Sequence, residues 1–221
     1  MNRPKIPGLA PALEINSIFC IGRNYVDHIK ELNNEQPDEP IVFFKPITSI
    51  LFNGGTVRLP RQSTDVHHEV ELVIAIGKKG RDIPKERALE YVAGYGVGID
   101  ITARDLQTKA KNARHPWSVA KGFDTFAPVS SFVDVHAVKD PQDLDLKLEV
   151  NNSVRQHDNT NLMIFPVTDL ISYLSGVFTL HPGDLIFTGT PAGVSPLKKG
   201  DQIKATLGDE LCTLSLNVDN Q

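Results

Sequence analysis

The stretch that decides the fold of this 221-residue chain is Val66-His67-His68-Glu69-Val70-Glu71-Leu72-Val73-Ile74-Ala75-Ile76-Gly77. Its second part, from Glu69 to Gly77, is predicted to be a buried β-strand, because an apolar run of this length is typical of one. Alternate side chains of a strand share a face, so Glu69 and Glu71 project side by side, roughly 5 to 7 Å apart. Buried carboxylates that close repel each other, and a divalent metal ion is one means of compensation. The alternative is that the strand emerges into solvent here and both glutamates are hydrated.

Composition and charge indicate which classes of protein to set aside. Hydrophobic residues make up 40% of the chain, and the formal net charge is −4. A chain of this kind has no electrostatic footprint for nucleic acid or an anionic membrane, and no apolar run approaches the ~20 residues that span a bilayer. The N-terminus lacks a secretory signal, and Cys20 and Cys212 are predicted to be small core residues in a reducing compartment. We expect a cytoplasmic protein with neither nucleic acid nor membrane as a partner.

The pattern of short apolar segments predicts a β-rich α+β fold. Strands are expected over 17–21, 41–44, 69–77, 95–101, 184–187, 202–207 and 211–218, and helices over 24–32, 84–92, 103–113 and 166–174, the last closed by Gly176. A regular βαβ alternation is absent, which favours a rolled or sandwich-like sheet with a few peripheral helices over a Rossmann-type architecture. Residues 1–16 are predicted to be an N-terminal extension, and residues 17–221 one catalytic domain.

A second acidic residue ends a row of alternating glycines. In the predicted strand, Gly94, Gly96 and Gly98 share one face with Asp100. Glycine weakens a strand, so a row of three alternating glycines needs a reason. One reason is that another group needs room or approaches the backbone closely on that face. The other is a bulge or a sharp coil of the strand.

Together with Glu69 and Glu71, Asp100 would form an all-carboxylate site, which favours hard cations such as Mg²⁺, Mn²⁺ or Ca²⁺. The competing interpretation is an iron site of two histidines and one carboxylate, in which His67 or His68 joins the glutamates.

Four further segments carry candidate chemistry. On a helix over 24–32, His28 and Glu31 are three residues apart and therefore neighbours, either as a general base with its orienting carboxylate or as an ordinary surface pair. Lys45 and Lys121 each follow apolar residues and are candidates for holding an anionic substrate. Gly-Thr-Pro-Ala-Gly, residues 189–193, could cradle a carboxylate with its N–H groups and the Thr190 hydroxyl, or be a plain turn.

Taken together, these segments resemble the fumarylacetoacetate hydrolase family, in particular its small single-domain acylpyruvase-like branch. Six motifs occur in the family's order: Gly22-Arg23-Asn24-Tyr25…His28…Glu31, Phe44-Lys45-Pro46, His67-His68-Glu69-x-Glu71, Asp100-x-Thr102-Ala103-Arg104-Asp105-x-Gln107, Ala120-Lys121-Gly122-Phe123 and Gly189-Thr190-Pro191-Ala192-Gly193-Val194. They cover most of the chain from residue 18 onward.

The resemblance implies a role for each motif. It implies that Glu69, Glu71 and Asp100 bind Mg²⁺ or Mn²⁺. It implies that His28 and Glu31 activate water on a segment that closes as a lid, and that Lys121 contacts substrate. The implied substrate-pocket positions are Arg23, Lys45, Arg104, Gln107, Gly189 and Thr190. Relatives have a mixed β-roll fold and are commonly homodimers, so both are expected here.

The predicted reaction is metal-dependent hydrolysis of a C–C bond in a 2,4-dioxo acid such as an acylpyruvate. The alternative is decarboxylation of oxaloacetate, or isomerisation and decarboxylation of catechol-degradation intermediates, through the same metal-stabilised enolate chemistry. A third interpretation is a metal-binding protein that has kept the fold and lost turnover.

Overall fold

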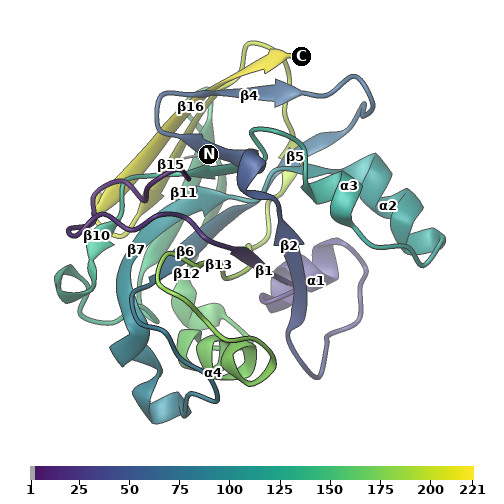
Figure 1. Ribbon diagram of the computed structural model, residues 1–221. Coiled ribbons are helices and arrows are strands. Elements are labelled where there is room, and N and C mark those ends of the chain that lie inside the picture. The colour runs from purple at the N-terminus through teal and green to yellow at the C-terminus, as the bar shows by residue number, and fades with distance from the viewer. Residues whose placement is uncertain (1–2) are drawn as a thin grey trace.

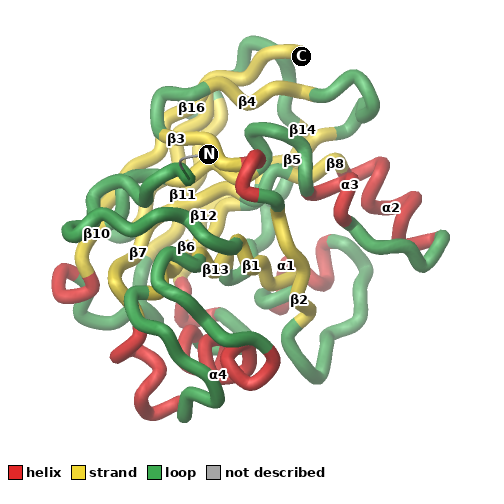
Figure 2. Tube along the Cα trace, viewed as in Figure 1, coloured by secondary structure: helices red, strands yellow, loops and turns green. Residues whose placement is uncertain are grey.

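A computed structural model describes residues 3–221, in which strands occupy the centre and helices the periphery (Figures 1 and 2). The largest sheet has eight strands: β1 (Ile18–Gly22), β2 (Ile41–Lys45), β3 (Ile50–Phe52), β6 (Val70–Ile76), β7 (Val92–Ile99), β9 (Ala127–Val129), β10 (Val133–Asp134) and β13 (Leu185–Phe187). Their order is β2-β1-β13-β6-β7-β9-β3, with β10 paired to β7. The sheet is mixed, since β1 runs parallel to β13 whereas β6 is antiparallel to both of its neighbours.

Two smaller sheets complete the β-structure. One has the order β12-β11-β15-β16-β4 and the other the order β14-β5-β8. Their strands are β4 (Thr56–Leu59), β5 (Val66–His68), β8 (Thr102–Ala103), β11 (Asp145–Val150), β12 (Ser153–Asn159), β14 (Ser195–Pro196), β15 (Gln202–Leu207) and β16 (Cys212–Asn220).

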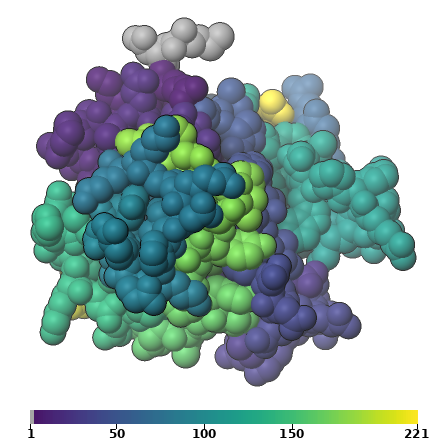
Figure 3. Space-filling model, turned by 60° about the horizontal axis from the view of Figure 1, so that its bottom comes forward, coloured from purple at the N-terminus to yellow at the C-terminus, as the bar shows by residue number. Residues whose placement is uncertain are grey.

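The helices are few and short. The α-helices are α1 (Val26–Glu31), α2 (Arg104–Asn112), α3 (Ser118–Lys121) and α4 (Val167–Val177), and the 3₁₀ helices are η1 (Ile47–Ser49), η2 (Lys85–Tyr91), η3 (Val135–Ala137) and η4 (Thr160–Leu162). Figure 3 shows one outer face of the molecule, on which the blue segment that contains η2 lies over the green segment that contains α4. None of the helices in residues 3–221 has the length and apolar character that a bilayer crossing requires.

The main hydrophobic core lies between the eight-stranded and five-stranded sheets. Strand β6 is buried along its whole length, because β7 and β13 flank it and apolar side chains cover both of its faces. From its sheet Leu72 and Ile74 enter this core, and Leu148 and Leu214 enter it from the other sheet. The predicted β-rich α+β fold with a curled mixed sheet is therefore confirmed.

A second core covers the opposite face of the eight-stranded sheet. There Val73 and Phe187 pack against Phe132 and against Ile6 and Leu9 of the N-terminal segment. The carbonyl of Pro7 accepts a hydrogen bond from the N–H of Phe132 at 2.8 Å. The N-terminal segment thus packs onto the sheet, while the boundary between an extension and a catalytic domain stays a prediction.

The alternating glycines of β7 serve close packing. A Cβ on Gly96 would lie 3.0 Å from the Phe132 ring, and one on Gly98 would lie 2.7 Å from Phe187. Aromatic rings of the second core therefore occupy the face that the glycines leave free. Both interpretations of the glycine row are therefore confirmed: rings approach closely at Gly96 and Gly98, and the pairing of β7 with β6 shifts register beside Gly94.

Several predicted elements differ in their limits or type. Within the segment 84–92, residues Lys85–Tyr91 form the 3₁₀ helix η2 in place of an α-helix, with Ala88 buried and Tyr91 packed against the core. The expectation that Gly176 closes the last helix is wrong, since α4 continues to Val177. The strand expected over 69–77 begins at Val70, and the one expected over 95–101 runs from Val92 to Ile99. The segment 33–40 is mostly exposed coil, as expected, and both cysteines are free and buried within strands.

Candidate metal centre and active site

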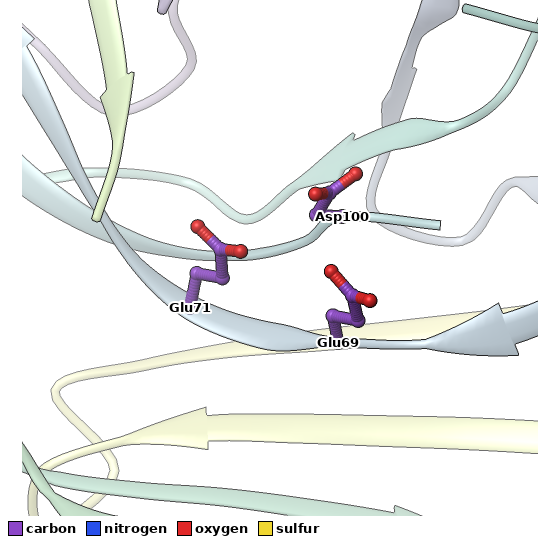
Figure 4. Close-up of side chains that lie close together, drawn as sticks. All are labelled: Glu69, Glu71 and Asp100. Carbon is purple, nitrogen blue, oxygen red and sulfur yellow. The ribbon is translucent and has the colours of Figure 1, made fainter. Parts of the chain in front are cut away.

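Three carboxylates converge at one end of the β6–β7 pair (Figure 4). Glu69 lies in the gap between β5 and β6, Glu71 lies on β6, and Asp100 follows β7 directly. The register of this pair, extended by a 2.8 Å hydrogen bond from the N–H of Asp100 to the carbonyl of Glu69, brings them together. One oxygen from each lies within 4.8 Å of the others, and the residues are 1 to 4% exposed. The interpretation of Glu69 and Glu71 as hydrated surface residues is therefore wrong.

Cationic side chains pair with two of the three carboxylates. The ammonium of Lys121 donates hydrogen bonds to Glu69, at 2.9 Å, and to Asp100. Arg104 pairs with the other oxygen of Glu69, and Lys45 lies 2.7 Å from Asp100. Burial would raise the pKa of Glu69, but the charges of Lys121 and then Arg104 outweigh it and hold that pKa well below its usual range.

Glu71 is the carboxylate without a cationic partner within 4.0 Å in residues 3–221. Its Oε2 accepts a hydrogen bond from the N–H of Gly189 at 2.8 Å. Burial, followed by the charges of Asp100 and Glu69, raises its pKa well above the usual range. A buried anion beside two others requires positive charge, and three converging carboxylates offer the oxygen ligands that a hard divalent cation prefers. The residues present therefore fit Mg²⁺ or Mn²⁺.

The two histidines of the decisive stretch face other partners. His68 is buried, and its ring lies 2.8 Å from Gln156 Oε1 and 2.8 Å from Ser195 Oγ. His67 pairs with Asp65 at 2.8 Å. Within residues 3–221 neither belongs to a cluster of three potential metal ligands, which removes the support for an iron site of two histidines and one carboxylate.

Helix α1 places His28 and Glu31 over the carboxylates. His28 is buried, lines the same cavity as the three acids, and has its Nδ1 3.4 Å from Glu31 Oε2. Glu31 also accepts hydrogen bonds from the N–H of Gly193 at 3.1 and 3.2 Å. Partial burial would raise the pKa of Glu31, but the hydrogen bonds from His28 and Gly193 lower it. The helix is thus latched to the loop over 189–193.

That loop depends on two glycines and a buried glutamine. Gly189 and Gly193 have φ of +96° and +98°, a left-handed backbone that suits glycine and aims their N–H groups at Glu71 and Glu31. The amide of Gln156 donates to Thr190 Oγ1 at 2.8 Å. Because the Thr190 oxygen accepts there, its own hydrogen is free to donate to a ligand.

Helix α2 presents three polar side chains to the cavity at intervals that share one face: Arg104, Gln107 and Lys111. Arg104 donates to Gln107 at 2.6 Å, and Lys111 donates to Asn34 at 3.1 Å. The sequence motifs predict the first two but not Lys111, although its spacing of seven residues from Arg104 indicates that it shares their helix face.

The cavity over the carboxylates gathers most of the predicted site residues. Its lining includes Arg23, His28, Arg104, Gln107, Lys121 and Thr190 beside the three acids. Lys45 does not line it: the fully buried ammonium lies behind Asp100, where the carbonyls of Ile101 and Lys121 accept its hydrogen bonds at 2.9 and 2.5 Å. The free volume is about 30 Å³, enough for about two water molecules.

Comparison with known proteins connects this geometry to a family. Residues 17–218 match the family described as fumarylacetoacetate (FAA) hydrolase C-terminal. Over 188 residues, the chain is 51% identical to a mitochondrial oxaloacetate tautomerase of Arabidopsis thaliana, covering 85% of this chain and 84% of the relative. It is 50% identical, also over 188 residues, to a mitochondrial oxaloacetate decarboxylase of Dictyostelium discoideum, covering 85% and 86%.

A solved structure with the same fold carries ligands. The fumarylpyruvate hydrolase of Pseudomonas aeruginosa, crystallised with Mn²⁺ and pyruvate, is 35% identical, with a TM-score of 0.93 over 100% of this chain and 97% of that one. Another similar structure is a 5-carboxymethyl-2-hydroxymuconate delta-isomerase from Mycobacterium smegmatis, 37% identical, with a TM-score of 0.85 over 95% and 79% of the two chains.

Proposed function

The chain belongs to the fumarylacetoacetate hydrolase family and is an enzyme of it, and on this premise we propose that it acts on oxaloacetate, as a tautomerase or decarboxylase that requires Mg²⁺ or Mn²⁺. The observation that carries the proposal is the cluster of Glu69, Glu71 and Asp100 beneath His28, with Lys121 between two of the acids. The curated relatives at 50 and 51% identity favour oxaloacetate over the acylpyruvate that the sequence motifs predict.

Charge complementarity supports an anionic oxo acid as substrate. The charges of the three carboxylates are formally cancelled by those of Lys45, Lys121 and Arg104, the three cations that pair with Glu69 and Asp100. A divalent cation held by Glu69, Glu71 and Asp100 would polarise the 2-oxo group as a Lewis acid and leave the site positive. A 2-oxo acid brings the matching negative charge.

In the tautomerase reaction, a proton leaves C3 of oxaloacetate, and a proton reaches the oxygen on C2. His28 is the proposed base: when its Nδ1–H donates to Glu31, Nε2 keeps a lone pair for the C3 proton. Glu31 fixes the orientation of the ring and stabilises the imidazolium that forms. Thr190 lines the cavity with a hydroxyl hydrogen that is free to donate to the developing oxyanion. The Lys121 ammonium, whose three N–H groups donate to Glu69, Asp100 and Thr102, stabilises the oxyanion through its positive charge.

Decarboxylation needs no base, and it gives the enolate of pyruvate, whereas proton removal gives that of oxaloacetate. The C3–C4 bond breaks, CO₂ leaves, and the electron pair of that bond forms the C2–C3 double bond of the pyruvate enolate. Lys121 again stabilises the oxygen, and a proton added to C3 gives pyruvate. His28 is therefore expected to be required for tautomerisation and dispensable for decarboxylation.

Hydrolysis of an acylpyruvate-type substrate is the second candidate. It is favoured by the similarity to the fumarylpyruvate hydrolase and by the position of His28, which would then take a proton from water. The attacked carbonyl is at C4, and the leaving group is the same pyruvate enolate.

The test measures three activities of one metal-loaded protein. Keto–enol conversion of oxaloacetate is followed by the ultraviolet absorbance of the enol, its decarboxylation by pyruvate formation, and acetylpyruvate hydrolysis by acetate formation, each with Mn²⁺ and with Mg²⁺. His28→Gln should remove tautomerisation and spare most of the decarboxylation. Glu69→Ala should abolish every metal-dependent reaction.

Two results would overturn the proposal. Acetylpyruvate cleavage that exceeds both oxaloacetate activities by tenfold or more would make the hydrolase the main function. Failure of the metal-loaded protein on a wider panel of 2-oxo and 2,4-dioxo acids would revive the non-catalytic interpretation.

Motion of α1 is part of the proposal. His28 of α1 lines the cavity, and the chain over 33–40 that follows is mostly exposed coil, so the segment over 24–40 is proposed to move aside for substrate entry and to return. Assembly as a homodimer and a cytoplasmic location stay predictions. Light scattering tests the first, and the two curated relatives above are mitochondrial.

A further inference from the structure

Two cations at the cavity have no carboxylate partner in the described chain. Arg23 and Lys111 both line the cavity that contains the acidic cluster. Arg23 donates to the carbonyl of Glu35 at 3.2 Å, and Lys111 donates to Asn34 Oδ1 at 3.1 Å. Within residues 3–221 no Asp or Glu oxygen lies within 4.0 Å of either one. This contrasts with Lys45, Lys121 and Arg104, each of which pairs with an acid of the cluster.

The backbone holds Arg23 in an unfavourable conformation. Its φ is +60°, in the left-handed region that side chains other than Gly, Asn and Asp rarely adopt. Sparsely populated conformations of this kind persist where the surrounding structure imposes them, and they concentrate at ligand sites. Here the strained residue follows β1 directly and contributes a guanidinium to the cavity wall.

Lys111 experiences the positive charge of its neighbours. Partial burial, followed by the charges of Arg23 and Arg104, lowers the pKa of its ammonium. Holding cations close together costs free energy unless an anion joins them. The proteins that accept such a cost commonly bind a carboxylate or phosphate there.

The position along α2 indicates where that anion would be. Arg104 contacts Glu69 of the cluster, and Lys111 is seven residues further along the same helix, about 10 Å along its axis. A flexible lysine reaches back over part of that span. If the 2-oxo acid end of a ligand lies at the acidic cluster, the opposite end of the ligand is therefore placed to contact Lys111.

We propose that Lys111 and Arg23 form a second anion subsite, which selects 2-oxo acids that carry a second carboxylate at the far end of a short carbon chain. This inference rests on the proposed function, because it takes the 2-oxo acid end to be at the cluster. Lys111 and Arg23 are specificity-determining residues of this subsite and take no part in proton transfer.

The test compares two ligands that differ only at the far end. The compound 2-oxoglutarate has a carboxylate where 2-oxovalerate has a methyl group, and both have five carbons. Their Kd values are measured by calorimetry on the Mn²⁺-loaded protein. The wild type should bind 2-oxoglutarate at least about tenfold more tightly, since charge-assisted hydrogen bonds of this kind exceed the tenfold threshold.

Matched variants identify the residues responsible. Lys111→Met, which keeps an unbranched apolar stem, should reduce the preference about tenfold and leave the Kd of 2-oxovalerate within twofold. Arg23→Gly should do the same and also relieve the left-handed backbone, so that loss of folding does not confuse the result. Lys111→Arg should keep most of the preference. Lys109→Met, at an exposed position of the same helix, should keep all of it.

The outcomes separate this inference from the proposed function. If the wild type binds both ligands equally, or if Lys111→Met weakens both to the same extent, the second subsite is wrong while oxaloacetate turnover can stand. If the Mn²⁺-loaded wild type binds neither ligand and turns over no 2-oxo acid, the proposed function and this inference both fail.

Discussion

The amide of Gln156 holds the hydroxyl of Thr190 at 2.8 Å, and the same side chain supports the strand of the acidic cluster. Its Oε1 accepts from the N–H of Val70 at 3.0 Å, between Glu69 and Glu71, and its Nε2 also donates to the carbonyl of Pro191 at 2.9 Å. Gln156 is 1% exposed. One buried amide thus fixes the loop over 189–193 relative to the candidate metal ligands.

Gln156→Ala should therefore destabilise the protein and loosen the site together. The substitution leaves the N–H of Val70 and the carbonyl of Pro191 buried without partners, at about 3 kcal/mol in the free energy of unfolding. Binding of 2-oxo acids should weaken as Thr190 loses its support. Urea unfolding and calorimetry check the two effects. Gln202→Ala, at an exposed position of β15 in the same sheet, is the control and should cost less than about 0.5 kcal/mol. Equal losses in both variants would contradict the role of Gln156.

Sequence periodicity was sufficient for the strands that carry the site but gave no indication of Gln156. Strand β6 is a continuous apolar run, and Cys212, Leu214, Leu216 and Val218 alternate along β16, so burial leaves a readable pattern. In contrast, β12 is an edge strand, mostly exposed and built of polar residues. Such a strand forms because β11 offers backbone partners across the two-residue turn Asn151-Asn152, in which both residues have positive φ. Because β12 is mostly polar, it shows no apolar alternation that would mark it as a strand.

The acidic cluster was predictable in membership and only partly in geometry. Glu69 and Glu71 are two residues apart, so strand periodicity alone places both on the same face. The approach of Asp100 depends on the antiparallel register that sets Val70 opposite Ile99, which is a property of two strands together. The displacement of Lys45 behind Asp100 likewise follows from the β1–β2 pairing and from burial, so motif position alone assigned it to the cavity wall.

Gly189→Ala tests whether the left-handed backbone aims its N–H at Glu71. A Cβ there would lie 2.7 Å from the Cβ of Asn24, so the variant combines a strained φ with a clash. Gly200→Ala is the matched control, since its φ is +90° and a Cβ would meet nothing within 4 Å. The control should lose about 1 to 2 kcal/mol of stability from strain alone. Gly189→Ala should lose more and bind Mn²⁺ more weakly. Thermal unfolding with and without Mn²⁺ measures both effects, and identical behaviour would count against the aimed N–H.

Glu31→Ala should release α1 from the loop over 189–193. The carboxylate accepts from Gly193 and pairs with His28, so its loss removes the contacts of that side chain at the helix. We expect amide hydrogen exchange over 26–36 to accelerate by about tenfold, equivalent to ~1.4 kcal/mol of local stability. Glu39→Ala, an exposed acid of the adjoining loop, is the control. Unchanged exchange in Glu31→Ala would show that the latch does not hold the helix.

Acid stability should depend on Asp105 in the first turn of α2. Burial would raise its pKa, but hydrogen bonds from the Ser63 hydroxyl, at 2.6 Å, and the N–H of Thr64, at 3.0 Å, lower it. A carboxyl with a lower pKa in the folded state stabilises the protein above its unfolded pKa of about 3.9 and loses that contribution as the pH falls through the folded value. Asp105→Asn should therefore lower stability at pH 7 and reduce the further loss of stability as the pH falls below about 4. Fluorescence of Trp117, the single tryptophan, follows the unfolding. If the variant and the wild type lose stability equally below about pH 4, Asp105 does not contribute to acid unfolding.

Glu71→Gln separates metal binding from folding. In metal-free protein, Glu71 is buried beside Asp100 and Glu69 with the N–H of Gly189 as its hydrogen-bond donor, so removal of its charge should raise stability by about 1 kcal/mol or more. The same change removes a ligand from the proposed cation site. Mn²⁺ at 100 times its Kd should stabilise the wild type by about 2.7 kcal/mol and leave Glu71→Gln nearly unchanged. Unfolding with EDTA and with excess Mn²⁺ measures both terms, and Glu86→Gln on the exposed surface should follow the wild type in both. We expect Glu71→Gln to be more stable than the wild type in EDTA and less stable in excess Mn²⁺. This pair of results would show that Glu71 binds the cation and destabilises the metal-free fold. A variant that is less stable in EDTA, or that still responds fully to Mn²⁺, would remove Glu71 from the ligand set.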